Sequence, residues 1–276
     1  MSQVKAAEVA KLRKVTGAGM MDCKNALVES NGNFDKAIET IRKRGQAIAN
    51  KRADKEASEG VVIAKASDDN KKGIIVALNC ETDFVAKNED FVLFANQIAD
   101  TALANNPSNL EELLKLTIND KSIAELVVEK TGVVGEKVDL TYYDVLEAEF
   151  VIPYIHLGSK LATIVGMNKR IENIQVGKDV AMQVAAMNPV SVSKDNVPEE
   201  VIQKEIEIGK GQAREQGKPE ELLEKIAMGK LNKFFKESTL LSQDFIKDGK
   251  KSVQQYLQEA DNELTVTRFL RYSLTN

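Results

Sequence analysis

The sequence predicts an α+β protein, and three observations lead to this prediction. The first 48 residues carry apolar side chains at helical spacing in three short runs. Between residues 60 and 189, a strand hairpin followed by a helix occurs twice, and residues 198–237 contain two charged helical runs. A chain of 276 residues with 43% hydrophobic content has ample material for a core. We therefore expect helices and antiparallel sheets in separate parts of one chain.

Glycine and asparagine divide the N-terminal region into three predicted helices. The run AAEVAKLRKVTGAG stops at Gly17 and Gly19, and the run MMDCKNALVESNG stops at Gly32, a residue type that tolerates the left-handed conformation after a helix. Asn33 is a good N-cap for the third run, FDKAIETIRKRG, which Gly45 is expected to close. Residues 46–60 are charged and lack a sustained apolar stripe, which indicates a linker, either irregular or partly helical.

The chain beyond this linker divides into a two-part core and a helical hairpin. The hairpin runs are joined by Gly217, Lys218 and Pro219, with glycine expected at C′ and proline at N1. The C-terminal segment reads as a short helix and a strand that returns to the second half of the sheet. The predicted parts are a three-helix module with its linker (1–54), the first half of the core (55–140), the second half of the core (141–191, completed by 239–276) and the hairpin (192–238).

The two halves of the core show a weak internal repeat. IIVALN ends at Asn79 and TIVGMN ends at Asn168, and the helices that follow end near Pro107 and Pro189. The first copy spans 28 positions (107 − 79) and the second 21 (189 − 168), and we place the excess of seven around ETDFVAK. If the halves share a local fold, that fold does not require this loop.

Phe84 and Val85 stand in this loop, between an apolar strand and a helix N-terminus. One interpretation is that they fold back onto the sheet and fill the gap beside the helix. The other is that the loop is exposed and its aromatic ring serves as an anchor for a partner, which is how buried aromatic residues commonly act in interfaces. The length excess favours the second interpretation, and residue type alone leaves both open.

Composition excludes several function classes. The net charge is −4 and the pI is about 5.4, which does not indicate nucleic-acid binding. Cys23 and Cys80 are far apart and adjoin no second Cys or His, so we expect no metal site, no disulfide and a reducing cytoplasm. No signal peptide or membrane span is predicted. With His156 as the only histidine, acid–base catalysis would have to rest on other groups.

Met20, Met21 and His156 are three further candidate contact residues. Met20 and Met21 begin a helix side by side, and adjacent positions cannot both face inward easily, so one of them is expected to be available to a partner. His156 lies near the tip of the turn YIHLGSKL, where a surface histidine without a catalytic role is the default interpretation.

Four stretches of the sequence resemble the elongation factor Ts family. They are LRKVTGAGMMDCKNAL (12–27), NCETDFVAKNEDF (79–91), and YIHLGSKLATIV (154–165) together with EQGKPEELLEKIAMGKLNKFF (215–235). The resemblance implies an N-terminal module similar to ubiquitin-associated domains, an α+β core of two related halves, and a hairpin known as the dimerisation or coiled-coil domain.

The resemblance also implies a function and a set of site residues. Members are guanine-nucleotide exchange factors that bind elongation factor Tu, both with GDP and free of nucleotide, and need no cofactor. The element at Thr82, Asp83, Phe84 and Val85 is associated in the family with displacing Mg²⁺ from that partner. The family match further places Arg13, Met20 and Met21 near the partner's nucleotide-binding domain and His156 near a more distant one. This implies a cytoplasmic protein without catalytic chemistry of its own.

Two other classes of protein compete with this interpretation. One is an adaptor whose N-terminal helices and hairpin bind helical or ubiquitin-like partners without exchange activity. The other, less favoured, is an enzyme with two carboxylates that converge on a pocket. An apolar residue presented at the end of a sheet distinguishes an exchange factor from an adaptor, because an adaptor with helical binding surfaces would not need it. Whether the hairpin also forms a homodimer is left open by the sequence.

Overall fold

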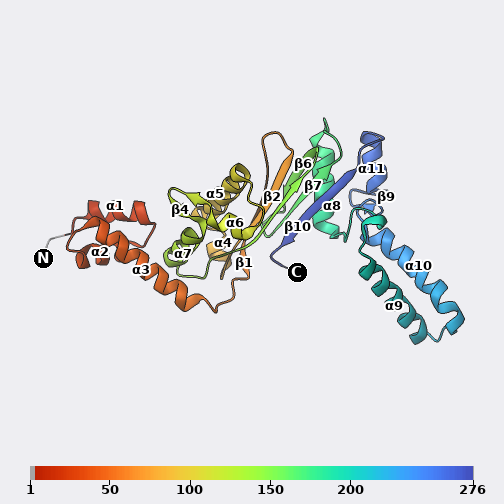
Figure 1. The fold of residues 1–276 in the computed structure, drawn as a ribbon, viewed down its shortest axis with the longest axis horizontal. Coiled ribbons are helices and arrows are strands. Elements are labelled where there is room, and N and C mark those ends of the chain that lie inside the picture. The colour runs from red at the N-terminus through yellow and green to blue at the C-terminus, as the bar shows by residue number, and fades with distance from the viewer. Residues whose placement is uncertain (1–3, 276) are drawn as a thin grey trace. The chain divides into compact units, whose positions relative to one another are not determined.

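The computed structural model describes residues 4–275 and has the predicted α+β architecture (Figure 1). The chain forms two compact units. Of the described residues, the first unit contains 4–63, 76–144 and 274–275, and the second contains Ala64–Ile75 and Val145–Ser273. The division into four parts proposed above remains a prediction about domains.

Three helices form the start of the chain, as predicted: α1 (Ala6–Thr16), α2 (Met20–Glu29) and α3 (Phe34–Arg52). Gly17 ends α1 in the left-handed conformation, with φ of 69°, and the N–H of Gly32 donates to the carbonyl of Leu27. The Asn33 side chain caps α3 by accepting from the N–H of Lys36 at 3.0 Å. The helices share a small core of buried side chains, which are Val9, Leu12, Ala18, Cys23, Ala26, Leu27 and Ala37.

The predicted end of the third helix at Gly45 is wrong, because α3 continues to Arg52 and takes in residues 46–52 of the expected linker. Gly45 is buried against Gly132 of α7 (Ile123–Val134). A Cβ atom added to Gly132 would lie 2.4 Å from the Cα of Gly45. The glycines therefore allow two helix backbones to touch, and Gly45 serves this close approach instead of ending its helix.

The first half of the core contains the strands β1 (Glu59–Ala66), β2 (Lys72–Cys80) and β5 (Asp139–Glu147), which form one sheet in the order β1-β2-β5. After β2 come α4 (Asp83–Ala86), α5 (Glu89–Asn105) and α6 (Leu110–Lys115), then a small antiparallel pair of β3 (Thr117–Ile118) and β4 (Lys121–Ser122), and then α7. The predicted stripe of Phe91, Phe94, Ile98 and Ala102 on α5 is buried.

The second half of the core is an antiparallel sheet of β6 (Phe150–Ile155), β7 (Leu161–Met167) and β10 (Val266–Ser273) in the order β10-β7-β6. Phe150 pairs with Met167, and Phe269 pairs with Val165 across β7. The helix α8 (Ile174–Met187) follows, and β8 (Asp244–Phe245), β9 (Asp248–Ser252) and α11 (Val253–Ala260) precede the last strand. The C-terminal strand thus returns to this sheet, as predicted.

A helical hairpin lies between α8 and β8, made of α9 (Glu199–Glu215) and α10 (Glu220–Ser238) after a short 3₁₀ turn at Lys194–Asn196. Gly217 adopts φ of 70°, and its N–H donates to the carbonyl of Arg214. Pro219 is the N-cap of α10, one position before the predicted N1. Leu223 and Leu231 are buried in the seam, whereas Leu222 is exposed.

One buried carboxylate joins three segments of the second unit. Asp179 of α8 accepts hydrogen bonds from Lys247 Nζ at 2.7 Å, from Gln175 Nε2 at 2.6 Å and from the Tyr256 hydroxyl at 2.9 Å. Burial by itself raises the pKa of the Asp179 carboxyl. The three hydrogen-bond donors together lower this pKa by more than burial raises it, so the net pKa lies below its ordinary value. The ionised carboxylate therefore stabilises the fold at neutral pH.

The contact between α3 and α7 leads to a first prediction. Gly132→Ala should lower the free energy of unfolding, because the overpacking cost of about 1–3 kcal/mol exceeds the helix-propensity gain of about 1 kcal/mol. Gly45→Ala is the matched control, since its Cβ would lie 3.5 Å from Gly132 Cα, an ordinary contact, and it should be neutral or stabilising. Urea denaturation measures both. Equal effects of the two substitutions would contradict a close backbone contact.

The Asp179 cluster leads to a second prediction. Asp179→Asn should reduce the free energy of unfolding at pH 7 by about 1–3 kcal/mol. Because the folded-state pKa is lowered, the contribution is present above the unfolded-state pKa of about 3.9 and is lost as the pH falls through the folded-state pKa. The difference between wild type and variant should therefore shrink in acid, as followed by urea denaturation at several pH values. Glu237→Gln, in the exposed pair with Lys233, is the control, and a pH-independent difference would argue against the ion pair.

Candidate functional site

The segment between β2 and α5 forms one helical turn, α4, where a loop was predicted. The carbonyl of Thr82 accepts from the N–H of Ala86 at 3.2 Å, and the carbonyl of Asp83 accepts from the N–H of Lys87 at 3.0 Å. The Asn88 side chain then caps α5. Asn88 N–H also donates to the carbonyl of Val85 at 3.0 Å, so three successive backbone N–H groups are hydrogen-bonded within the turn.

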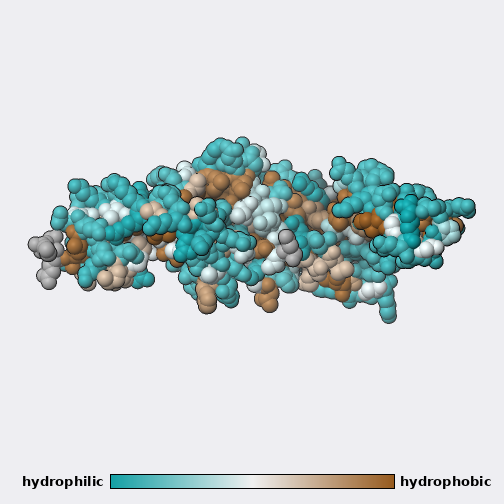
Figure 2. Space-filling model, turned by 90° about the horizontal axis from the view of Figure 1, so that it is seen from below, coloured by the Kyte–Doolittle hydropathy of each residue, from teal (hydrophilic) through white to brown (hydrophobic). Residues whose placement is uncertain are grey.

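Phe84 projects from this turn with 83% of its surface exposed. Val85 is half-buried and Ala86 is buried, since successive residues of a helical turn point about 100° apart. The structure thus favours the exposed interpretation for the ring of Phe84, while Val85 packs partly against the body of the protein. Figure 2 shows one face of the molecule, on which hydrophobic residues occur as separate patches among hydrophilic ones.

The length excess of the first repeat is only partly located in this turn. From Asn79 to the start of α5 at Glu89 is ten positions (89 − 79), against six from Asn168 to the start of α8 at Ile174 (174 − 168). Four of the seven extra residues therefore lie in the connection. The other three lengthen the helix, since α5 has 17 residues and α8 has 14. Placing the whole excess around ETDFVAK was wrong.

Two glutamates hold the beginning of the turn. The Glu136 carboxylate accepts from the Thr82 N–H at 3.0 Å and from its hydroxyl at 2.7 Å. The Glu81 carboxylate accepts from the Lys137 N–H at 2.6 Å and from an Arg52 guanidinium nitrogen at 2.7 Å. The sequence analysis missed Glu136, which lies 54 residues from Thr82 and belongs to no recognisable motif.

The remaining groups of the turn give no reactive centre. Asp83 pairs with Lys87 at 2.6 Å, and this hydrogen bond raises the pKa of the Lys87 ammonium. Burial, aided by the carboxylates of Glu136 and Glu59, raises the pKa of the Cys80 thiol to about 12. Cys80 therefore stays a neutral thiol near pH 7 and is a poor nucleophile or metal ligand.

The other predicted site residues lie in different elements. Arg13 is exposed on α1, and Met20 and Met21 are both exposed at the start of α2, where only one was expected to be. His156 is exposed at the tip of the β6–β7 hairpin, in the second unit, with its Nδ1 3.0 Å from the Tyr154 hydroxyl. Leu157 beside it is 95% exposed, and the sequence analysis did not single it out.

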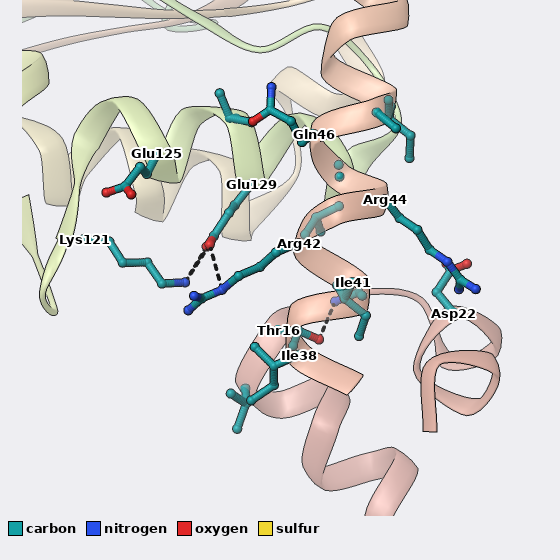
Figure 3. A pocket seen from close by; sticks show the side chains of 18 of the residues that line it. Thr16, Asp22, Ile38, Ile41, Arg42, Arg44, Gln46, Lys121, Glu125 and Glu129 are labelled. Atoms are coloured by element: carbon teal, nitrogen blue, oxygen red, sulfur yellow. Dashed lines mark hydrogen bonds and ion pairs between the residues drawn. The ribbon is translucent and has the colours of Figure 1, made fainter. Parts of the chain in front are cut away.

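A pocket of about 760 Å³ lies in the first unit between α3, α7 and the α1–α2 turn (Figure 3). Arg42 and Lys121 both point toward Glu129, at 3.4 and 2.6 Å. Glu129 is shared by the two cations, and its pair with Arg42 links α7 to α3 along the polar wall of the pocket. The pocket contains none of the predicted site residues.

Among residues 4–275, no group of His, Cys, Asp or Glu side chains is arranged to hold a metal ion. Within the same range, every helix is too short or too polar to cross a membrane.

Comparisons with known proteins agree across the chain. The family model described as elongation factor TS matches residues 81–276. The elongation factor Ts of Christiangramia forsetii is 52% identical over 275 residues, which is 99% of this chain and 100% of the relative. That of Porphyromonas gingivalis is 50% identical over 268 residues and 97% of each chain, and that of Flavobacterium psychrophilum is 48% identical over 275 residues, 99% of this chain and 100% of the relative.

Proposed function

Because the chain belongs to the elongation factor Ts family, we propose that it binds elongation factor Tu with GDP and promotes GDP release by disturbing the partner's Mg²⁺ and phosphate site. GTP then rebinds during translation elongation, and the protein acts in the cytoplasm. The observation that carries this proposal is the ring of Phe84, 83% exposed on a turn with a hydrogen-bonded backbone.

An exposed aromatic ring on a fixed turn suits the role of a wedge. Burying it in a partner contributes roughly 1.5–3 kcal/mol, and the fixed backbone reduces the conformational entropy lost on binding. Thr82, Asp83 and Val85 form the rest of this element, with Thr82 as the N-cap of the turn that carries the ring. The adaptor interpretation gives no role to such a ring, so its exposure supports exchange activity.

The target of the wedge is sensitive to small shifts. Mg²⁺ requires near-ideal octahedral geometry and bridges nucleotide phosphate oxygens to the protein that binds them. A displacement of its protein ligands by a fraction of an ångström therefore weakens GDP binding. The exchange factor itself needs no catalytic acid, base or cofactor, in keeping with the neutral Cys80 thiol and the exposed, single His156.

Exchange then follows from thermodynamic linkage. A protein that binds the nucleotide-free partner more tightly than the GDP-bound partner lowers GDP affinity by the same factor. Additional contacts from Arg13, Met20 and Met21 in the first unit and from His156 in the second would add to affinity for the partner. Exposed apolar side chains on α9 and α10 are the surface through which a homodimer would form, and they are Ile208, Leu222 and Met228.

The wedge leads to a third prediction. Phe84→Ala should slow the stimulated release of fluorescent GDP from elongation factor Tu roughly tenfold or more. Loss of the ring removes roughly 1.5–3 kcal/mol of burial energy, and each 1.4 kcal/mol or so corresponds to a factor of ten. The free energy of unfolding should change by less than about 0.5 kcal/mol, since the ring is exposed.

Leu93→Ala is the matched control, because Leu93 is an exposed apolar residue of α5 outside the turn, and it should leave release near the wild-type rate. Unchanged release with Phe84→Ala would rule out the wedge. No stimulated release by the wild type would rule out the exchange function.

A further inference from the structure

Glu81 and Glu136 make a reciprocal pair of hydrogen bonds. The side chain of Glu136 accepts from the backbone N–H of Thr82, the residue after Glu81, at 3.0 Å. The side chain of Glu81 accepts from the backbone N–H of Lys137, the residue after Glu136, at 2.6 Å. The end of β2 and the segment after α7 are therefore fixed to each other by two carboxylates. Each carboxylate accepts from the backbone N–H of the residue that follows the other glutamate.

The second oxygen of each carboxylate extends this brace. Glu136 Oε1 accepts from the Thr82 hydroxyl at 2.7 Å, and Glu81 Oε2 accepts from Arg52, the last residue of α3, at 2.7 Å. Lys137 Nζ also donates to the carbonyl of Ala53 at 2.9 Å. Charge-assisted hydrogen bonds of this kind are shorter and stronger than neutral ones. The turn that carries Phe84 is thus tied to the C-termini of both α3 and α7.

Thr82 is the point at which this brace reaches the turn. It is the N-cap residue of α4, but its side chain makes no capping hydrogen bond within the helix, and its hydroxyl donates to Glu136. A helix of four residues has no stability of its own in water. The orientation of Phe84, two residues beyond Thr82, therefore depends on the hydrogen bonds from outside the turn.

We propose that Glu136 is a positioning residue for nucleotide exchange: by holding both the N–H and the hydroxyl of Thr82, it presents the ring of Phe84 in the orientation that the partner receives. This inference rests on the proposed function. Glu81 and Arg52 support the same orientation from the side of α3. A turn without Glu136 would still form part of the time, but the ring would have to be ordered on binding, at a cost in the rate-limiting step.

Five proteins test the proposal: wild type, Glu136→Ala, Glu136→Gln, Phe84→Ala and the double variant. At saturating concentrations of the exchange factor, Glu136→Ala should slow GDP release from elongation factor Tu roughly fivefold to tenfold, because both hydrogen bonds to Thr82 are lost while the hydrogen bonds within the turn remain. Glu136→Gln should recover most of the rate, because its amide oxygen can accept from the Thr82 N–H while its NH₂ donates to the Thr82 hydroxyl.

The double variant separates positioning from general stability. If Glu136 acts through Phe84, adding Glu136→Ala to Phe84→Ala should slow release by less than a further factor of about two. Glu129→Ala is the matched control, because Glu129 is a glutamate of α7, the helix that precedes Glu136, and pairs with Arg42 of α3 but is not hydrogen-bonded to the turn. It should leave exchange near the wild-type rate.

Thr82→Val, which removes only the hydroxyl bond, gives a second route should Glu136→Ala fold poorly, and it should slow release by a smaller factor than Glu136→Ala. Wild-type rates for both Glu136→Ala and Thr82→Val would overturn the inference, as would an equal effect of Glu136→Ala with and without the Phe84 ring. Absence of exchange by the wild type would overturn the proposed function instead.

Discussion

The backbones of α3 and α7 touch at Gly45 and Gly132, and the geometry of the candidate site depends on this contact. The close approach brings Arg52 and Glu136, at and just beyond the ends of these helices, to the turn that follows β2. Two carboxylates then convert the helix ends into a fixed support for Phe84. The exposed ring is thus the outermost element of a chain of contacts that begins in the N-terminal helices.

Under the proposed function, the turn acts on a partner through its shape and its apolar ring, without a reactive group in the turn itself. Side chains of the turn are either paired, as Asp83 and Lys87 are, or neutral, as Cys80 is. In the proposed exchange, the turn offers the partner an apolar ring held in place, and the energy comes from the difference in affinity for two states of the partner. Rigidity is the property that such a mechanism requires, because a ring that must first be ordered spends binding energy on its own conformation.

The sequence predicted the local parts of this structure well and the contacts across it poorly. Caps such as Asn33, the left-handed glycines and the stripe of α5 depend on nearby residues, and the structure confirmed them. Gly45 was misinterpreted because a glycine that ends a helix and one that admits a neighbouring backbone look alike in one sequence. The exposure of Phe84 could be argued only from repeat length. The role of Glu136 could not be predicted from the sequence, because its hydrogen-bond partner Thr82 lies 54 positions away.

The central claim is that the turn acts on the Mg²⁺ and phosphate site of elongation factor Tu. The most direct test is the rate of GDP release from elongation factor Tu, with and without this protein, at millimolar Mg²⁺ and again after chelation of the metal. We expect a large acceleration in the presence of Mg²⁺ that falls to a small factor without it, because the step that the protein promotes has then already occurred. The same acceleration under both conditions would contradict it.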